Sequence, residues 1–298
     1  CGMTRAEIEA TFSPELEALA VKSDATCRQV MDRLTRQYDG YRFTKDEEFT
    51  SMYNPFSVLS ALQKRSYGNY WFASGTPTFL VEMLQKTDFD LREMEGIEVN
   101  EASLSDDRAD INNPIPMIYQ SGYLTIKDYD ERFRMYTLGF PNEEVKYGFL
   151  NFVSPFYTPI AQTDTSFYIG KFIRELESGD VDAFLTRLRC FFAGIPYDLN
   201  DRTERHYQTV FYLVFQLMGQ FTETEVRSAR GRADAVVKTP DYIYVFEFKL
   251  NDSAEAALRQ IDEKGYLLPY QADGRKVVKV GVAFEKEERN IGEWVIGG

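Results

Sequence analysis

The stretch that decides the fold is Gly231-Arg232-Ala233-Asp234-Ala235-Val236-Val237-Lys238, followed by Tyr242-Ile243-Tyr244-Val245-Phe246-Glu247-Phe248-Lys249. Both runs are rich in β-branched and aromatic residues, which predicts strands over 231–238 and 242–249. The intervening Pro240-Asp241 suits a two-residue turn. In that register Asp234 faces Glu247, with Cβ atoms about 5 Å apart. A slip of one residue would separate them.

Charged side chains in this hairpin need an explanation. Successive strand residues point to opposite faces, so Glu247 and Lys249 share one face while Phe246 and Phe248 share the other. Burying charge without a partner costs several kcal/mol, and a divalent metal held beside Asp234 would be such a partner. The alternative is a cross-strand ion pair without a catalytic role, worth at most about 1 kcal/mol if exposed.

The surrounding elements favour the metal site. A helix is predicted over 201–219, a second over 253–268, and a buried strand over 276–284. The order helix, three strands, helix, strand, with Asp and then Glu-x-Lys on the strands, resembles the PD-(D/E)XK nuclease superfamily. The resemblance implies an α/β domain over 199–298, with a restriction-endonuclease-like mixed sheet flanked by helices.

The resemblance also implies the reaction, which is hydrolysis of a phosphodiester in nucleic acid. Asp234, Glu247 and the main-chain carbonyl of Phe248 would offer hard oxygen ligands, which favour Mg²⁺ or Mn²⁺. Lys249 would orient the attacking water or offset charge that develops on the phosphate.

Two helix residues complete the predicted catalytic set. Glu204, on the helical face of Gln208 and Phe211, corresponds to the superfamily's helix-borne glutamate. Its alternative role is to partner the helix cap at Asp201. Gln260 begins "QIDEKGY", which resembles the Gln-containing motif of many of these nucleases. It would position the lysine, a ligand water or the nucleic-acid backbone; alternatively it is a solvated helix residue.

Charge is distributed unevenly along the chain, whose net charge is −13. Residues 201–298 carry 14 basic and 16 acidic side chains, a net of −2, whereas residues 1–200 carry 20 and 31, a net of −11. This balance predicts weak or highly selective nucleic-acid binding. The expected partner is nucleic acid, with DNA favoured over RNA. Candidate phosphate contacts are Arg227, Arg230, Arg232 and Lys264. The three arginines could equally be a solvated strand edge.

Composition excludes several other classes. The 298 residues suffice for two or three domains. Cys1, Cys27 and Cys190 lack metal-ligand spacing and are expected to be reduced thiols of a cytoplasmic protein. No apolar run of about 18 residues predicts a membrane span. His206 is the single histidine and lies in an apolar helix, which argues against a histidine-based hydrolase.

The first 200 residues predict a mostly helical region with one β-hairpin, so that the chain is α+β overall. The hairpin is expected between residues 123–126 and 133–138, and residues 100–112 are expected to form a loop. The predicted helices cover 5–20, 24–38, a segment after Asn54-Pro55, 77–86, a segment from 141, 166–177 and 180–193.

Five motifs in this region resemble a bacterial family of AAA-ATPase-like proteins with a C-terminal PD-(D/E)XK nuclease-like domain. They are "YDGYRF", "YNPFSVLSAL", "YWFASGTPTFL", "SGYLTI" and "PNEEV". The resemblance implies that residues 1–160 form the lid and winged-helix-like end of the ATPase module, with a helical connector over 161–198. The chain has no GxxxxGK[ST] phosphate loop, so ATP is not expected to bind this fragment. A nucleotide core upstream of Cys1, in contact with this chain, is a further expectation.

These observations lead to a metal-dependent nuclease as the predicted function. The alternative is a non-cleaving nucleic-acid-binding or regulatory module of an ATPase-like protein. A third hypothesis assigns the acidic N-terminal region to protein interaction.

Overall fold

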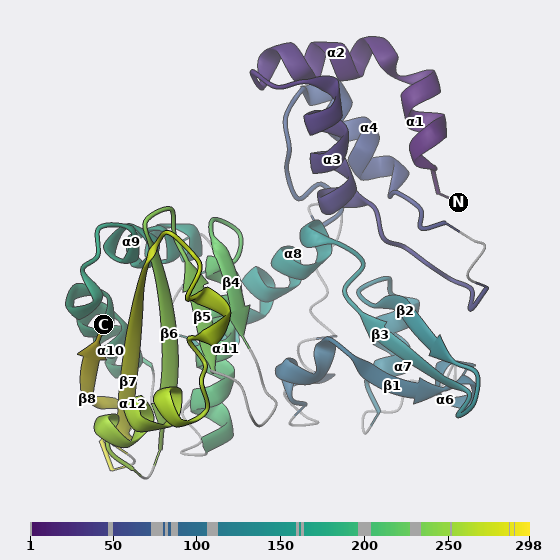
Figure 1. Cartoon of the computed structure of the whole chain (residues 1–298). Helices are drawn as coiled ribbons and strands as arrows, with labels where there is room; N and C mark the ends of the chain where they lie inside the picture. The colour runs from purple at the N-terminus through teal and green to yellow at the C-terminus, as the bar shows by residue number, and fades with distance from the viewer. Residues whose placement is uncertain are drawn as a thin grey trace. The chain divides into compact units, whose positions relative to one another are not determined.

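The chain forms two compact units, Cys1–Phe149 and Leu150–Gly298. The computed structural model (Figure 1) describes residues 2–46, 50–72, 80, 83–84, 89–105, 113–158, 161, 164–195, 204–226, 234–250, 252–285, 287–288 and 290–298. The side chains of residues 105, 204–207 and 226 lie outside this description.

The first unit combines a helical bundle with a small sheet. Its elements are α1 (Arg5–Thr11), α2 (Ser13–Lys22), α3 (Cys27–Tyr38), α4 (Pro55–Lys64), η2 (Leu91–Met94), β1 (Ile97–Asn100), α6 (Glu101–Ser105), α7 (Ile115–Gln120), β2 (Thr125–Asp130), β3 (Met135–Gly139) and the start of α8 (Glu143–Val153). The strand order is β1-β3-β2, and both pairings are antiparallel. The expected hairpin is therefore confirmed as β2 and β3, although its first strand runs from Thr125 to Asp130 rather than over 123–126.

Two expectations for this unit were wrong in detail. The helix expected over 5–20 is broken at Phe12, because Pro14 suits the first turn of α2 but lacks the N–H that a continuous helix would need. The loop expected over 100–112 contains α6, whose first turn is capped by Asn100 accepting from the Ser103 N–H at 2.9 Å. Most of the helix expected over 77–86 lies outside the described residues.

The second unit is built on a five-stranded sheet. Its elements are η3 (Ser154–Phe156), α9 (Thr165–Glu177), α10 (Val181–Ala193), α11 (Glu204–Met218), β4 (Glu223–Val226), β5 (Ala235–Lys238), β6 (Tyr242–Lys249), α12 (Ala254–Glu263), η4 (Leu268–Tyr270), β7 (Lys276–Glu285) and β8 (Asn290–Gly297). The strand order is β4-β5-β6-β7-β8, in which only β6 and β7 run parallel. The mixed α/β architecture is confirmed, with β8 as a strand that the sequence had not predicted.

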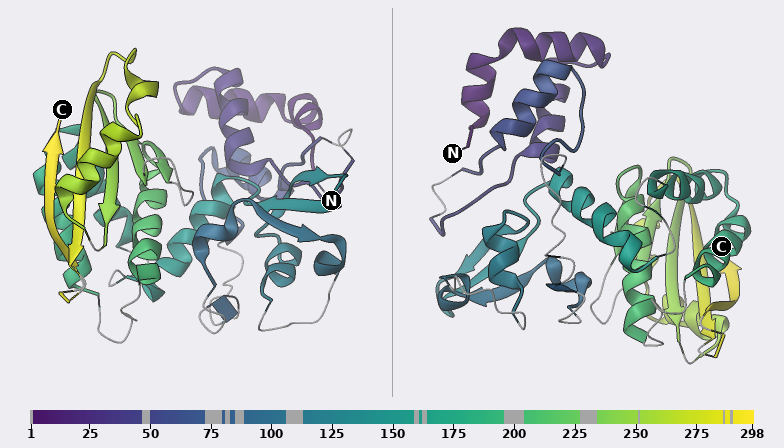
Figure 2. Two further views of the ribbon diagram at one scale, coloured as in Figure 1. Left: turned by 60° about the horizontal axis from the view of Figure 1, so that its bottom comes forward. Right: turned by 180° about the vertical axis from the view of Figure 1, so that it is seen from behind.

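Helices cover the two faces of this sheet (Figures 1 and 2). On one face an aromatic core joins α10 and α11 to the strands, with Phe184 packed against Phe246 and Phe211 against Phe248. On the other face α12 contributes Ile261 to a core with Val245. Helices α9 and α10, expected to be a connector, thus belong to the compact second unit.

Helix ends in the second unit also differ from expectation. The helix expected over 253–268 ends at Glu263, because Gly265 adopts φ +65° and Pro269 follows soon after. The helix expected over 201–219 is described from Glu204, so the expected cap at Asp201 lies outside the described residues. None of the helices described here is long and apolar enough to cross a membrane.

Candidate active site

The β5–β6 hairpin has the register predicted from its turn. Ala235 pairs with Phe246, and the Thr239 N–H donates to the Tyr242 carbonyl at 2.8 Å to close the turn. Asp234 directly precedes β5, and its Oδ2 accepts from the Phe248 N–H at 2.9 Å. The prediction that the aspartate lies across the hairpin from the Glu-x-Lys segment is therefore confirmed.

Alternation along β6 separates aromatic from charged side chains. The Phe248 ring lies 3.8 Å, centre to centre, from Phe211 on α11. Glu247 and Lys249 point to the opposite face, where both contact Gln260 of α12. The sheet thus buries one side of β6 in an aromatic core and presents its charged side to α12.

Close packing of α12 on the sheet brings Gln260 into the site. Gly281 of β7 is the parallel partner of Glu247. A Cβ atom at Gly281 would overlap the carbonyl oxygen of Ala254 in the first turn of α12. The absence of a side chain at this position therefore allows the helix to cross β7 next to β6, with Gln260 over the charged residues.

Glu247 is the most buried charged group of the site. The residue is 2% exposed. Its Oε1 lies 3.3 Å from Lys249 Nζ and accepts from Gln260 Nε2. Its Oε2 is buried and has no hydrogen-bond partner in the part of the chain that is described. Burial, together with the negative charge of Asp234, raises the pKa of Glu247 to about 7.

Two neighbours favour the charged form of the Asp234 carboxyl group. Burial raises the pKa of its carboxyl group, while the Phe248 N–H and the charge of Lys249 act in the opposite direction. The two carboxylates and one ammonium therefore form an electrostatically coupled group. A cation that binds between the two carboxylates would offset the unfavourable free energy of burying their negative charges.

Gln260 holds the other groups in register. Its Oε1 accepts from Lys249 Nζ and its Nε2 donates to Glu247 Oε1, so each end of the amide contacts the group of complementary charge. Nε2 also lies 3.5 Å from the Tyr266 hydroxyl, and Tyr266 is 9% exposed. Sequence reasoning did not single out Tyr266, because it follows the end of α12 and has no helical spacing to Gln260.

The remaining candidate residues are placed only in part. Glu204 is the first residue of α11, but its side chain lies outside the described residues. Lys264 is exposed at the C-terminal cap of α12, one turn beyond Gln260. Arg227, Arg230 and Arg232 fall in segments outside the described residues. The structure thus brings together four of the predicted residues, which are Asp234, Glu247, Lys249 and Gln260.

The chemistry of the site fits a hard divalent cation. Two carboxylates converge, and the unpartnered buried Oε2 of Glu247 is an acceptor that such an ion would satisfy. Among the described residues there is no cluster of three or more His, Cys, Asp or Glu side chains that could hold a metal. Carbonyl or water ligands, or a carboxylate outside the described residues, would therefore have to complete the shell.

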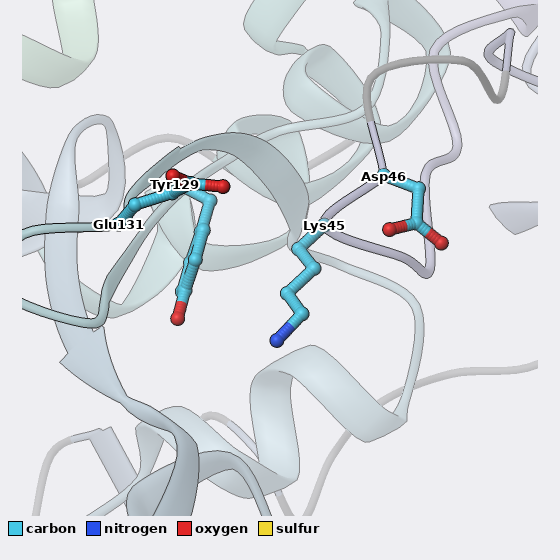
Figure 3. A pocket seen from close by; sticks show the side chains of 4 residues that line it. All are labelled: Lys45, Asp46, Tyr129 and Glu131. Carbon is cyan, nitrogen blue, oxygen red and sulfur yellow. The ribbon is translucent and has the colours of Figure 1, made fainter.

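A polar pocket lies elsewhere, in the first unit. It has a volume of about 670 Å³ and is lined by Lys45, Asp46, Tyr129 and Glu131 (Figure 3). Lys45 Nζ lies 5.2 Å from the centre of the Tyr129 ring. Two carboxylates, an ammonium and a phenol make it a mixed-charge surface feature without the buried unpaired acceptor that marks Glu247.

Comparison with known proteins finds a family match within the second unit. Residues 202–294 match the model of the PD-(D/E)XK nuclease superfamily. A relative in Azotobacter chroococcum mcd 1, described as "Uncharacterized protein in vnfD 5'region", is 32% identical over 305 residues. The match covers 99% of this chain and 56% of the relative, so the chain spans little more than half of the relative's length. No solved structure matches.

Proposed function

We propose that the second unit hydrolyses phosphodiester bonds of nucleic acid with Mg²⁺ or Mn²⁺. The observation that carries this proposal is the buried Glu247 carboxylate, whose Oε2 has no partner in the described structure, beside Asp234 on the sheet of a nuclease superfamily domain. An unsatisfied buried carboxylate oxygen costs about 1–3 kcal/mol or more, which favours a bound cation here over a purely structural ion pair.

The residues present define which groups would hold the ion. Asp234, Glu247 and the main-chain carbonyl of Phe248 are the proposed ligands, with Glu204 as a further ligand directly or through water. When bound, the ion would supply Lewis-acid activation of the phosphodiester and of the attacking water.

Lys249 is the proposed catalytic cation. Its ammonium group is held between Glu247 Oε1 and Gln260 Oε1, with 24% of the side chain exposed. That exposure leaves it accessible to a phosphate, where it would offset developing negative charge or orient the water. Gln260 would keep the ammonium group at this position, because it contacts both Lys249 and Glu247.

The wider setting of the reaction rests on sequence resemblance. We propose DNA as the favoured substrate. From the motifs that resemble AAA-ATPase-like proteins, we also propose an upstream ATPase-like core as a partner. Neither match described above names an ATPase. Cys27 and Cys190 are exposed free thiols, which supports a reducing cytoplasmic location.

A cleavage assay on single- and double-stranded DNA and RNA tests the proposal. We expect cutting with Mg²⁺ or Mn²⁺, none with EDTA, and a loss of at least 100-fold in Lys249→Ala. Lys279→Ala is the matched control, because Lys279 lies on the neighbouring strand in a surface pair with Asp262. Binding of Mn²⁺ that is equal in wild type and Asp234→Asn, or undetectable in both, would contradict the metal site and favour a non-cleaving module.

A further inference from the structure

The helical bundle of the first unit carries a concentration of positive charge in an acidic protein. Residues 21–38 and 61–70 together contain six basic and two acidic side chains, a net of +4, against −13 for the whole chain. One of the two acids, Asp32, is paired with Arg5 at 3.4 Å. These two segments are therefore positively charged although the whole chain is acidic.

The fold gathers these charges on one face. Helix α3 places Arg33 and Arg36 one turn apart, and both are exposed. Lys22 ends α2 and donates from Nζ to the Lys64 carbonyl at 3.3 Å, which ties the end of α2 to the end of α4. The segment after α4 returns alongside α3 (Figures 1 and 2), where Gly68 exchanges two 3.0 Å hydrogen bonds with Tyr38.

Tyrosine rings contact two of the cations, Arg33 and Lys64. The Arg33 guanidinium lies 3.9 Å from the centre of the Tyr67 ring. Lys64 Nζ lies 4.4 Å from the centre of the Tyr70 ring. We call Lys22, Arg33, Arg36, Lys64, Tyr67 and Tyr70 the basic tyrosine face. A cation that is held by a ring loses less entropy when it binds an anion.

These cations are not neutralised within the described chain. In the residues that the structure covers, Lys22, Arg33, Arg36 and Lys64 make no ion pair with a carboxylate. Elsewhere in the same unit a comparable cation–ring contact, Arg132 over Phe133 at 4.9 Å, lies in a hairpin that also carries acidic residues at 128, 130 and 131.

We propose that the basic tyrosine face binds the phosphate backbone of nucleic acid. Several exposed, pre-positioned cations without carboxylate partners match a regularly spaced polyanion in charge and in number. The face would give the acidic first unit its own contact with the nucleic acid. The choice of ligand rests on the proposed function of the second unit, whereas the charge arrangement does not.

Anisotropy of labelled 20-nucleotide DNA, single-stranded and duplex, tests the proposal on the full chain in EDTA, where no metal-dependent cleavage occurs. We expect the double variant Arg33→Glu/Lys64→Glu to bind about tenfold more weakly at 100 mM salt. The slope of log K against log salt should fall by about two, since each lost phosphate contact removes about one. Arg33→Gln/Lys64→Gln should show a smaller effect in the same direction, and it guards against misfolding of the reversed variant.

The control is Arg132→Glu/Lys171→Glu, which makes the same charge change at two other cation–ring contacts. Equal affinity and slope in wild type and Arg33→Glu/Lys64→Glu, or an equal loss in the control, would overturn the proposal. Binding of poly-glutamate with the same affinity and the same sensitivity would also overturn it, in favour of an acidic protein partner. Absence of cleavage together with unaltered DNA binding and salt slope would count against the catalytic site, whereas loss of the difference in salt slope would count against this face, so the two failures are distinguishable.

Discussion

At the scale of single residues, the buried carboxylate of Glu247 destabilises the folded protein when it is charged. Its pKa is raised from 4.5 to about 7 in the folded protein. Between those values the folded chain keeps a proton that the unfolded chain releases, so the free energy of unfolding falls as pH rises from about 4.5 through 7. The loss amounts to about 3 kcal/mol at most.

The direction of this pH dependence can be tested without a substrate. In EDTA, Glu247→Gln should raise the free energy of unfolding at pH 8 by about 1–3 kcal/mol and change it little at pH 5, because the neutral amide removes the buried charge. Urea unfolding at both pH values measures the difference. Glu255→Gln, at an exposed position on α12, should show no such pH dependence. A parallel response of the two variants would contradict the assigned pKa.

A bound metal ion should offset the destabilisation that the charged Glu247 causes. At pH 8 we expect Mn²⁺ at ten times its dissociation constant to stabilise wild type by about 1.4 kcal/mol, by mass action. Asp234→Asn and Glu247→Gln should lose this stabilisation, since each lacks one proposed ligand. Asp262→Asn, which changes an exposed carboxylate paired with Lys279, is the control. Differential scanning fluorimetry across a Mn²⁺ titration measures the shift, and a shift of the same size in all four proteins would rule out this site.

The site residues whose positions follow from the alternation of side chains along a strand were predictable from the sequence. Asp234, Glu247 and Lys249 follow from alternation and a two-residue turn. Tyr266 did not follow, because its approach to Gln260 depends on how the chain leaves α12 after Gly265. A contact that is made by the path of a turn has no periodic signal in the sequence.

At the scale of elements, the packing of α12 on β7 depends on Gly281. A methyl group there would overlap the Ala254 carbonyl, whereas one at Gly274 would meet nothing within 4 Å. We expect Gly281→Ala to lower the free energy of unfolding by about 1–3 kcal/mol and Gly274→Ala to change it by less than about 0.5 kcal/mol.

Gly281→Ala should also impair the site, because displacement of α12 moves Gln260 away from Lys249 and Glu247. Urea unfolding and the cleavage assay measure the two effects. If both glycine variants were equally stable, the close approach of helix and strand would not be needed for folding.

Elements were predictable where a local signal marks them. Asn54 caps α4, accepting from the Phe56 N–H at 3.0 Å, as the Asn-Pro pair predicted. The break at Phe12 was missed because the apolar period continues across it, although Pro14 marks the new helix. Strand β8 was missed because the alternation in residues 290–297 is weak, and pairing with β7 is a tertiary effect.

At the scale of the whole molecule, the charge asymmetry was readable from composition, whereas the compact unit that includes α9 and α10 was not. These helices join the sheet through aromatic contacts such as Phe184 with Phe246. Their amphipathic pattern predicts a buried face but not the element that covers it. The division into 1–160, 161–198 and 199–298 therefore stays a prediction beside the two observed units.

The two tryptophans allow the units to be followed separately. Trp71 lies in the first unit against Tyr123, with ring centres 5.1 Å apart, and Trp294 lies in the second, donating to Asp182 at 2.8 Å. Trp71→Phe leaves one reporter for the second unit, and Trp294→Phe leaves one for the first.

In thermal melts followed by tryptophan fluorescence, we expect Mn²⁺ to raise the midpoint reported by Trp294 and to leave that reported by Trp71 within about 1 °C. The reason is that the proposed ligands Asp234 and Glu247 belong to the second unit, and a ligand stabilises the cooperative unit that binds it. Equal shifts at both reporters would mean that the two compact units unfold as one.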